Sequence, residues 1–173
     1  MRAIIATVGT DSDTGDYVLR FNLSFNAGPG QSVNATLRYS VAVAPQFPDW
    51  YIEDVGFQIS GVSAIDTGVV NIGEQITSVP PPTTNPNNIL GQLNGGYFNS
   101  GLLSLLVDHA VFTPVKQIWI TKDVSISGGT AGLAHLSEVY QTFSQVPEPA
   151  SLALFALTGL TLLRRRRAGP DPD

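Results

Sequence analysis

Acidic residues near the start of the chain have a spacing that could bind calcium. The segment Asp11-Ser12-Asp13-Thr14-Gly15-Asp16 places side-chain oxygens at alternate positions and ends in a flexible glycine turn. Calcium takes about six to eight oxygen ligands, and this segment could supply roughly three or four. However, the glycine comes one position too early for an EF-hand loop, and the twelfth loop position is Asn22 instead of an acid. The sequence therefore favours a solvated acidic turn, and a calcium-dependent site stays open as the other interpretation.

The other residues with catalytic or metal-binding chemistry are scattered. His109 and His135 lack the local spacing of zinc ligands, and the chain contains no G-x-S-x-G nucleophile motif. A glycosidase needs two carboxylates that face each other across a sugar, and no pattern places Glu53 or Asp54 opposite Glu138 or Glu148. The chain has no cysteine, which excludes disulfides and thiolate chemistry. We therefore predict no catalytic residue, no metal, no cofactor and no enzymatic activity.

Aromatic residues near predicted loops are the candidates for a binding surface. Trp50 and Tyr51 follow a proline-rich loop, and Tyr97-Phe98 and Trp119 are the other candidates. Rings at loop ends can stack on sugars, although most such rings cover the hydrophobic core. The aromatic residues are compatible with a carbohydrate-binding module but do not require one.

The body of the chain alternates between apolar and polar residues, which is typical of β-strands. Residues 17–26 and 33–43 alternate on either side of a turn at 27–31, so we predict an antiparallel hairpin. We predict a second hairpin from residues 117–126 and 133–143, around a Gly-rich turn. Further predictions are strands at 55–59, 69–72 and 76–79, a proline-rich loop at 80–88, and either a strand or a short helix at 102–107.

Short strands between Gly- and Pro-rich turns indicate an all-β fold. We predict an antiparallel β-sandwich or jelly-roll-like body over residues 1–145, followed by a C-terminal transmembrane helix. Residues 1–146 contain five Lys or Arg against eleven Asp or Glu, a net charge of −6. A body with this negative net charge would repel the phosphate backbone, which argues against nucleic acid as a partner.

The C-terminal segment has three parts in a fixed order. Pro147-Glu148-Pro149 is expected to be extended, because each proline restricts its own backbone and the residue before it. An uncharged run follows from Ala150 to Leu163, which favours a helix that is apolar on all sides. The run is short for a bilayer, but the arginines Arg164, Arg165, Arg166 and Arg167 that close it can reach the headgroups. They place this end in the cytoplasm and the body outside.

This order of a Pro-Glu-Pro motif, an apolar helix and an arginine cluster resembles the PEP-CTERM sorting signal of exported bacterial proteins. The same kind of segment is also called an ice-binding protein C-terminal domain. The resemblance covers residues 146–167 and leaves 168–173 as a disordered tail. It implies recognition of Pro147, Glu148 and Pro149 by an exosortase, a membrane-embedded protease or transpeptidase. It also implies an inner-membrane precursor and a mature protein at the cell surface or in the extracellular matrix.

The first residues do not provide the export signal that this resemblance requires. Met1 to Val8 contain one basic residue and a short apolar stretch, and Asp11 follows soon after. We therefore expect that an N-terminal signal peptide is missing from the gene as read.

Together these features predict an exosortase-processed surface or matrix protein. Its body would have a structural or adhesive role and could contact exopolysaccharide. The second interpretation is a carbohydrate- or calcium-dependent ligand-binding module, and the third is a secreted hydrolase.

Overall fold

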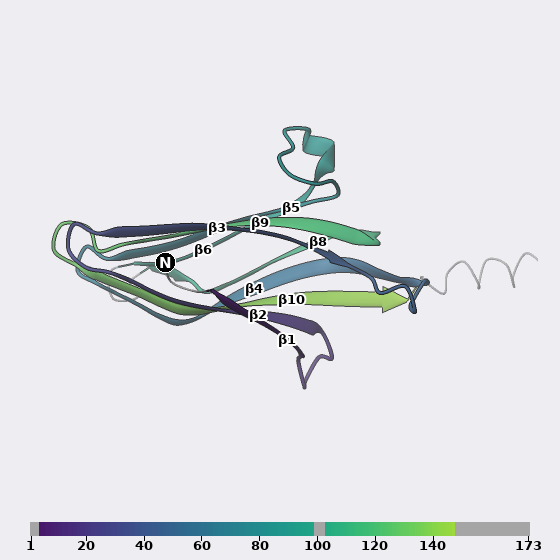
Figure 1. The fold of residues 1–173 in the computed structure, drawn as a ribbon, viewed down its shortest axis with the longest axis horizontal. Coiled ribbons are helices and arrows are strands. Elements are labelled where there is room, and N and C mark those ends of the chain that lie inside the picture. Colours follow the sequence, from purple (N-terminus) through teal and green to yellow (C-terminus); the bar gives the residue numbers. More distant parts are fainter. Residues whose placement is uncertain (1–3, 99–102, 148–173) are drawn as a thin grey trace, which may run out of the picture.

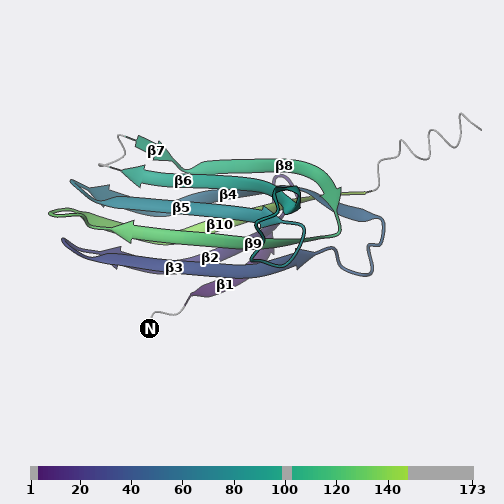
Figure 2. The same ribbon diagram turned by 90° about the horizontal axis from the view of Figure 1, so that it is seen from above.

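Two antiparallel sheets packed face to face form the body of the protein (Figure 1). The computed structural model describes residues 4–98 and 103–147. The predicted all-β antiparallel sandwich is confirmed. Sheet A contains, in spatial order, β1 (Ile5–Thr10), β2 (Tyr17–Ala27), β10 (Leu133–Pro147), β4 (Trp50–Ile65) and β8 (Val107–Val115). Sheet B contains β3 (Ser32–Ala42), β9 (Gln117–Ser127), β5 (Val69–Thr77), β6 (Ile89–Phe98) and β7 (Leu103–Leu105), and Figure 2 shows it from above.

The loop between β5 and β6 contains a single short 3-10 helix, Pro86–Asn88. This agrees with the predicted proline-rich loop. Within residues 4–98 and 103–147, no helix has the length and apolar character needed to cross a membrane. The predicted transmembrane helix at 150–163 lies outside the described residues.

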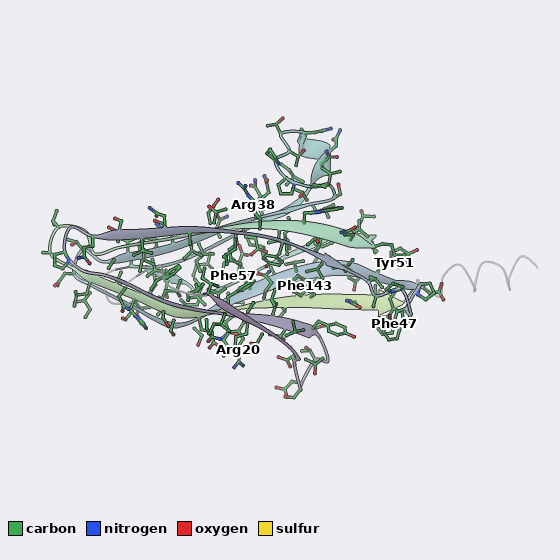
Figure 3. The ribbon with its side chains drawn as sticks, in the orientation of Figure 1. Arg20, Arg38, Phe47, Tyr51, Phe57 and Phe143 are labelled. Carbon is green, nitrogen blue, oxygen red and sulfur yellow. The ribbon has the colours of Figure 1, made fainter. Side chains whose placement is uncertain are left out.

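The core lies between the two sheets and follows the alternation seen in the sequence. In β2, Phe21, Leu23 and Phe25 are buried, while Arg20 points to solvent on the outer face of sheet A. Figure 3 shows Phe57 and Phe143 between the layers and Arg20 and Arg38 on opposite outer faces. Burial of apolar surface stabilises a fold by about 25 cal/mol per Å². The aliphatic and aromatic inner faces are therefore what holds the sheets together.

Both predicted hairpins are wrong. β2 pairs with β1 and β10 in sheet A, whereas β3 pairs with β9 in sheet B, so the two strands face each other across the core. In the same way, β9 belongs to sheet B and β10 to sheet A. The chain therefore crosses between sheets at each of these turns, in a jelly-roll-like order. Alternation shows that one face of a strand is buried, but it does not show which strand is the hydrogen-bonding neighbour.

Several strands differ from their predicted extent. The predicted strand at 55–59 is the middle of β4. The two predicted strands at 69–72 and 76–79 correspond to the single strand β5, which already ends at Thr77. The ambiguous segment at 102–107 contributes β7 and the start of β8. β1 and β6 were not predicted. All six residues of β1 are exposed, which removes the alternation, and β6 is interrupted by glycines.

Glycines allow three turns to pack backbone against backbone at one end of the sandwich. Gly30 N donates to Gly129 O at 2.6 Å, and Gly128 N donates to Gln31 O at 3.1 Å. The Thr67 hydroxyl donates to Gly128 O at 3.1 Å and accepts from Gly132 N at 3.0 Å. The turns that carry the chain from one sheet to the other are thereby tied to each other.

We predict that Gly132→Ala destabilises the body by about 1–3 kcal/mol, as overpacking does elsewhere. A Cβ at this position would lie 2.3 Å from the Ile65 carbonyl oxygen and 2.4 Å from Gly68 N, and backbone atoms cannot move aside. Gly73→Ala is the control, since a Cβ there meets no atom within 4 Å. It should leave stability unchanged or raise it by up to about 1 kcal/mol. Urea denaturation followed by tryptophan fluorescence measures both, and equal stabilities of the two variants would contradict this account of the turns.

Candidate functional site

The first candidate site is the end of sheet A where β10 reaches the predicted Pro-Glu-Pro motif. Gln145, Val146 and Pro147 pair with Ile52, Tyr51 and Trp50 of β4, after a β-bulge between Ser144 and Gln145. On its other side, β10 pairs with β2 only as far as Phe143. A proline has no N–H to donate, so it is tolerated where a strand loses one neighbour. The sheet therefore continues into the first proline of the motif without an intervening linker.

Two exposed aromatic side chains lie beside this strand end. Phe47 and Trp50 are 41% and 37% exposed, and their ring centroids are 5.9 Å apart. The backbone supports them through two tight turns, because Phe47 N donates to Ala44 O at 2.9 Å and Trp50 N donates to Phe47 O at 3.1 Å. We call the surface formed by Phe47, Trp50, Tyr51 and Lys116 the exit end. Figure 3 shows Phe47 and Tyr51 at the end of the sandwich where β10 finishes.

Lys116 fixes the shape of the exit end. Its ammonium group donates to the carbonyl oxygens of Pro48 and Trp50, the second at 2.8 Å, and lies 3.4 Å from the centroid of the Tyr51 ring. A cation over an aromatic face is attracted by the quadrupole of the ring. Lys116 thus joins the turn between β8 and β9 to the start of β4, the strand on which the last residues of β10 are paired.

Of the predicted recognition residues, only Pro147 belongs to a described strand. Glu148, Pro149 and Arg164 to Arg167 lie outside the described residues. Residues 145–167 match the family model of the PEP-CTERM protein-sorting motif. The chain carries a PEP-CTERM sorting motif. This confirms the resemblance drawn from the sequence, and the motif implies an exported protein that an exosortase processes.

No curated protein matches the chain. Among solved structures it is similar to the enzymatically active domain of tailspike protein 4 from bacteriophage CBA120, at 12% identity and a TM-score of 0.34. That match covers 81% of this chain and 18% of the tailspike chain. TmCBM61 in complex with β-1,4-galactotriose matches at 14% identity and a TM-score of 0.34, covering 84% of this chain and 88% of TmCBM61. Arabinose-bound MgGH51 α-L-arabinofuranosidase matches at 15% identity and a TM-score of 0.31, covering 85% and 22%. These TM-scores are too low for the likenesses to bear on function.

An apolar groove lies between the sheets next to the PEP-CTERM motif. It has a volume of about 550 Å³ and is lined by residues of β1, β2, β3, the β3–β4 loop and β10. Tyr17, Tyr39 and Phe47 supply aromatic rings, and Gln46 and Gln145 supply amides. Of the aromatic candidates from the sequence, Trp50 and Tyr51 lie at the exit end, while Tyr97 and Trp119 lie in β6 and β9 of sheet B.

In the acidic turn at residues 11–16, the carboxylate of Asp11 accepts hydrogen bonds from the backbone of the same turn. Asp11 Oδ1 accepts hydrogen bonds from Asp13 N at 2.8 Å and Thr14 N at 3.1 Å. The Asp13 bond contributes most to lowering the pKa of Asp11, followed by the Thr14 bond, since both favour the ionised form. In the described part of the chain, no group of three or more His, Asp or Glu side chains is arranged to hold a metal ion.

The histidines and the paired carboxylates do not converge on one centre. His109 lies in β8, and His135 Nδ1 in β10 is 2.7 Å from Asn26 Oδ1. The Ser144 hydroxyl donates to Asp54 at 3.4 Å, and Glu138 pairs with Arg20 at 3.1 Å. The expectation that the protein is not an enzyme stays a prediction.

A second group of reactive side chains lies in the core between the sheets, and sequence reasoning missed it. Lys122 of β9 and Gln141 of β10 are fully buried, and Glu74 of β5 is 4% exposed. The Lys122 ammonium forms an ion pair with Glu74 Oε2, while Gln141 Nε2 donates to Glu74 Oε1 at 2.9 Å and to Gly56 O at 2.9 Å. The Tyr39 hydroxyl donates to Gln141 Oε1 at 3.4 Å. We call Tyr39, Glu74, Lys122 and Gln141 the core cluster.

Burial acts against ionisation of this pair. Loss of water lowers the pKa of Lys122 and raises the pKa of Glu74, and in each case the charge of the other partner opposes part of the shift. Burial also raises the pKa of Tyr39 well above its usual value, so its hydroxyl keeps its proton. Lys122 Nζ also lies 4.7 Å from the centroid of the Phe57 ring.

The sequence did contain a signal for the core cluster. Lys122 lies on the inward-facing side of β9, as Ile120 and Val124 do. Glu74 lies on the inward-facing side of β5, together with Ile72 and Ile76. A charged residue at an inward position of an alternating strand is rare unless it is paired. Two such residues in separate strands, one basic and one acidic, indicate a buried pair.

Proposed function

We propose that this protein is made as a precursor held in the inner membrane by residues 150–163 and is sorted by an exosortase. Recognition uses Pro147, Glu148 and Pro149, and Arg164 to Arg167 keep the C-terminus in the cytoplasm. The mature product is the sandwich body at the cell surface or in the extracellular matrix, where it has a structural or adhesive role. The match of residues 145–167 to the PEP-CTERM motif supports the sorting step.

The direct continuation of β10 into the motif is the observation that carries this proposal. Pro147 is still paired with Trp50, and Glu148 and Pro149 alone separate it from the uncharged run that begins at Ala150. Consecutive Cα atoms are about 3.8 Å apart, so Ala150 lies at most about 11 Å from Pro147. A body on so short a connection stays close to the bilayer when residues 150–163 insert, with the exit end toward the lipid.

The exit end has side chains that suit this position. Tryptophan is enriched at membrane interfaces, where an amphipathic ring can lie at the level of the headgroups. Trp50 and Phe47 are exposed there, and Lys116 adds a positive charge next to Tyr51.

We predict that Glu148→Ala blocks maturation in the native host. Loss of the carboxylate between the two prolines should leave the full-length precursor in the membrane fraction, which immunoblotting of fractionated cells detects. Asp49→Ala is the matched control, because it removes one negative charge from an exposed position near the exit end and should mature normally. Normal processing of the Glu148 variant would refute the exosortase assignment.

We predict that Trp50 contacts the headgroup region in the membrane-inserted precursor. In proteoliposomes, Trp119→Phe leaves Trp50 as the sole tryptophan, and Trp50→Phe leaves Trp119 on the outward side of sheet B. Lipids with a quencher near the headgroup should quench Trp50 several-fold more strongly than Trp119. Equal quenching in precursor that resists carbonate extraction would show that the exit end does not face the bilayer.

The apolar groove supports a second candidate function, binding of a carbohydrate such as exopolysaccharide. Aromatic rings with a few convergent polar groups are typical of ligand sites, and Tyr17, which lines the groove, is 40% exposed.

For any oligosaccharide that the wild-type protein binds, we expect Tyr17→Ala to weaken the affinity about tenfold. This factor corresponds to the loss of one stacking contact of about 1.4 kcal/mol. Titration calorimetry with a panel of soluble oligosaccharides measures this. Trp119→Ala changes a residue that does not line the groove, so this variant should bind like the wild type. Unchanged affinity of the Tyr17 variant would exclude the groove as the binding site.

A further inference from the structure

The core cluster brings a primary amine, a carboxamide and a carboxyl group together in a dry interior. Glu74 contacts Lys122 through one carboxyl oxygen and Gln141 through the other, so a single group holds both reactants. Lys122 belongs to sheet B and Gln141 to sheet A. We propose that Lys122 Nζ and Gln141 Cδ join in an intramolecular isopeptide bond that links the two sheets covalently. This proposal does not depend on the sorting function.

Lys122 is the nucleophile. An amine must be neutral to attack a carbonyl carbon, and burial of a lysine in an apolar pocket favours its neutral form. Lys122 is fully buried, and burial also favours the protonated form of Glu74. Transfer of one proton from Lys122 to Glu74 therefore prepares the amine and the acid in one step.

Tyr39 activates the acyl group. Its hydroxyl donates to Gln141 Oε1, the oxygen on which negative charge develops as the carbonyl carbon becomes tetrahedral. A preorganised donor at this position stabilises the transition state, and it is most effective where water is excluded. Gly56 O accepts from Gln141 Nε2 and fixes the orientation of the amide.

Glu74 moves the protons. Nζ attacks Cδ, protonated Glu74 gives its proton to Nε2, and the resulting carboxylate takes the proton that the attacking nitrogen loses. The Cδ–Nε2 bond then breaks. The products are one secondary amide between Lys122 and Gln141 and one molecule of ammonia, so atoms and charge balance without an oxidant or a cofactor.

Removal of buried charge favours this reaction. The idealised cost of burying a charged group is large, and a buried ion pair recovers it only in part. The amide product is neutral, and Glu74 can remain protonated next to it. The reaction occurs once per chain, so it is a self-modification and requires no enzymatic turnover.

Mass spectrometry of the purified full-length protein tests the proposal. We expect the intact mass to be lower than the sequence mass by one ammonia. Trypsin should cut after Lys116 but not after Lys122, so peptide 117–122 should be absent. A peptide spanning 117–164 with the same mass deficit should replace it, because no other Lys or Arg lies between Lys122 and Arg164.

Variants identify the role of each group. Glu74→Gln keeps the shape of the side chain but cannot carry the proton, so we expect the full sequence mass and release of peptide 117–122. Tyr39→Phe should slow bond formation at least tenfold, measured by mass spectrometry as the fraction of chains with the ammonia deficit at set times after synthesis is induced. Lys116→Met is the control for an exposed lysine and should keep the mass deficit.

Three results would overturn the proposal. The first is an unmodified wild-type mass together with cleavage after Lys122. The second is loss of one water, which would place the bond on Glu74 instead of Gln141. The third is an unchanged mass deficit in the Glu74→Gln variant. The first two are measured on the wild-type protein, so they do not depend on the folding of any variant.

Discussion

The meeting of Lys122, Glu74 and Gln141 in the middle of the core is the constraint on which the sandwich depends. As the chain folds, before any bond forms between Lys122 and Gln141, Lys122 and Glu74 are a buried ion pair, and removal of one member of such a pair typically costs about 3–5 kcal/mol. The sheets must therefore meet in one register, with Gln141 opposite Glu74. In the described residues, no buried side-chain nitrogen or oxygen lacks a hydrogen-bond partner. The polar groups of the core thus specify a single alignment, which apolar packing alone would specify less strictly.

The sequence predicted the fold class because alternation is a local property. The inward residues of β2 and β9, such as Phe21 and Ile120, are visible in the sequence as every second position. Pairing between strands is not local, which is why both hairpins were mispredicted. The turn at Gly28 and Gly30 looks like a hairpin turn in sequence, but it connects the two sheets, and Gly30 N donates a hydrogen bond to Gly129 O of a second such turn.

The candidate sites were predictable to different degrees. The sorting motif was found from residue types alone, since Pro147, Glu148 and the arginines form a linear pattern that needs no tertiary structure to recognise. The core cluster needed the structure, because Glu74, Lys122 and Gln141 come from strands far apart in sequence. The exit end was predictable only in part. Trp50 was a candidate from the sequence, but its pairing with Pro147 depends on the register of β4 and β10.

Strand β10 lies between β2 and β4 and also leads into the sorting motif, which has a mechanical consequence. A pull on the C-terminal segment is transmitted along the axis of β10, because the strand continues through the bulge after Ser144 to Pro147. The backbone hydrogen bonds to β2 and β4 run across that axis, so the load falls on many of them in parallel as shear. Peeling, which would break these bonds one after another, requires a force from the side. In the proposed membrane-held precursor, drag on the body would therefore be resisted by these bonds acting together.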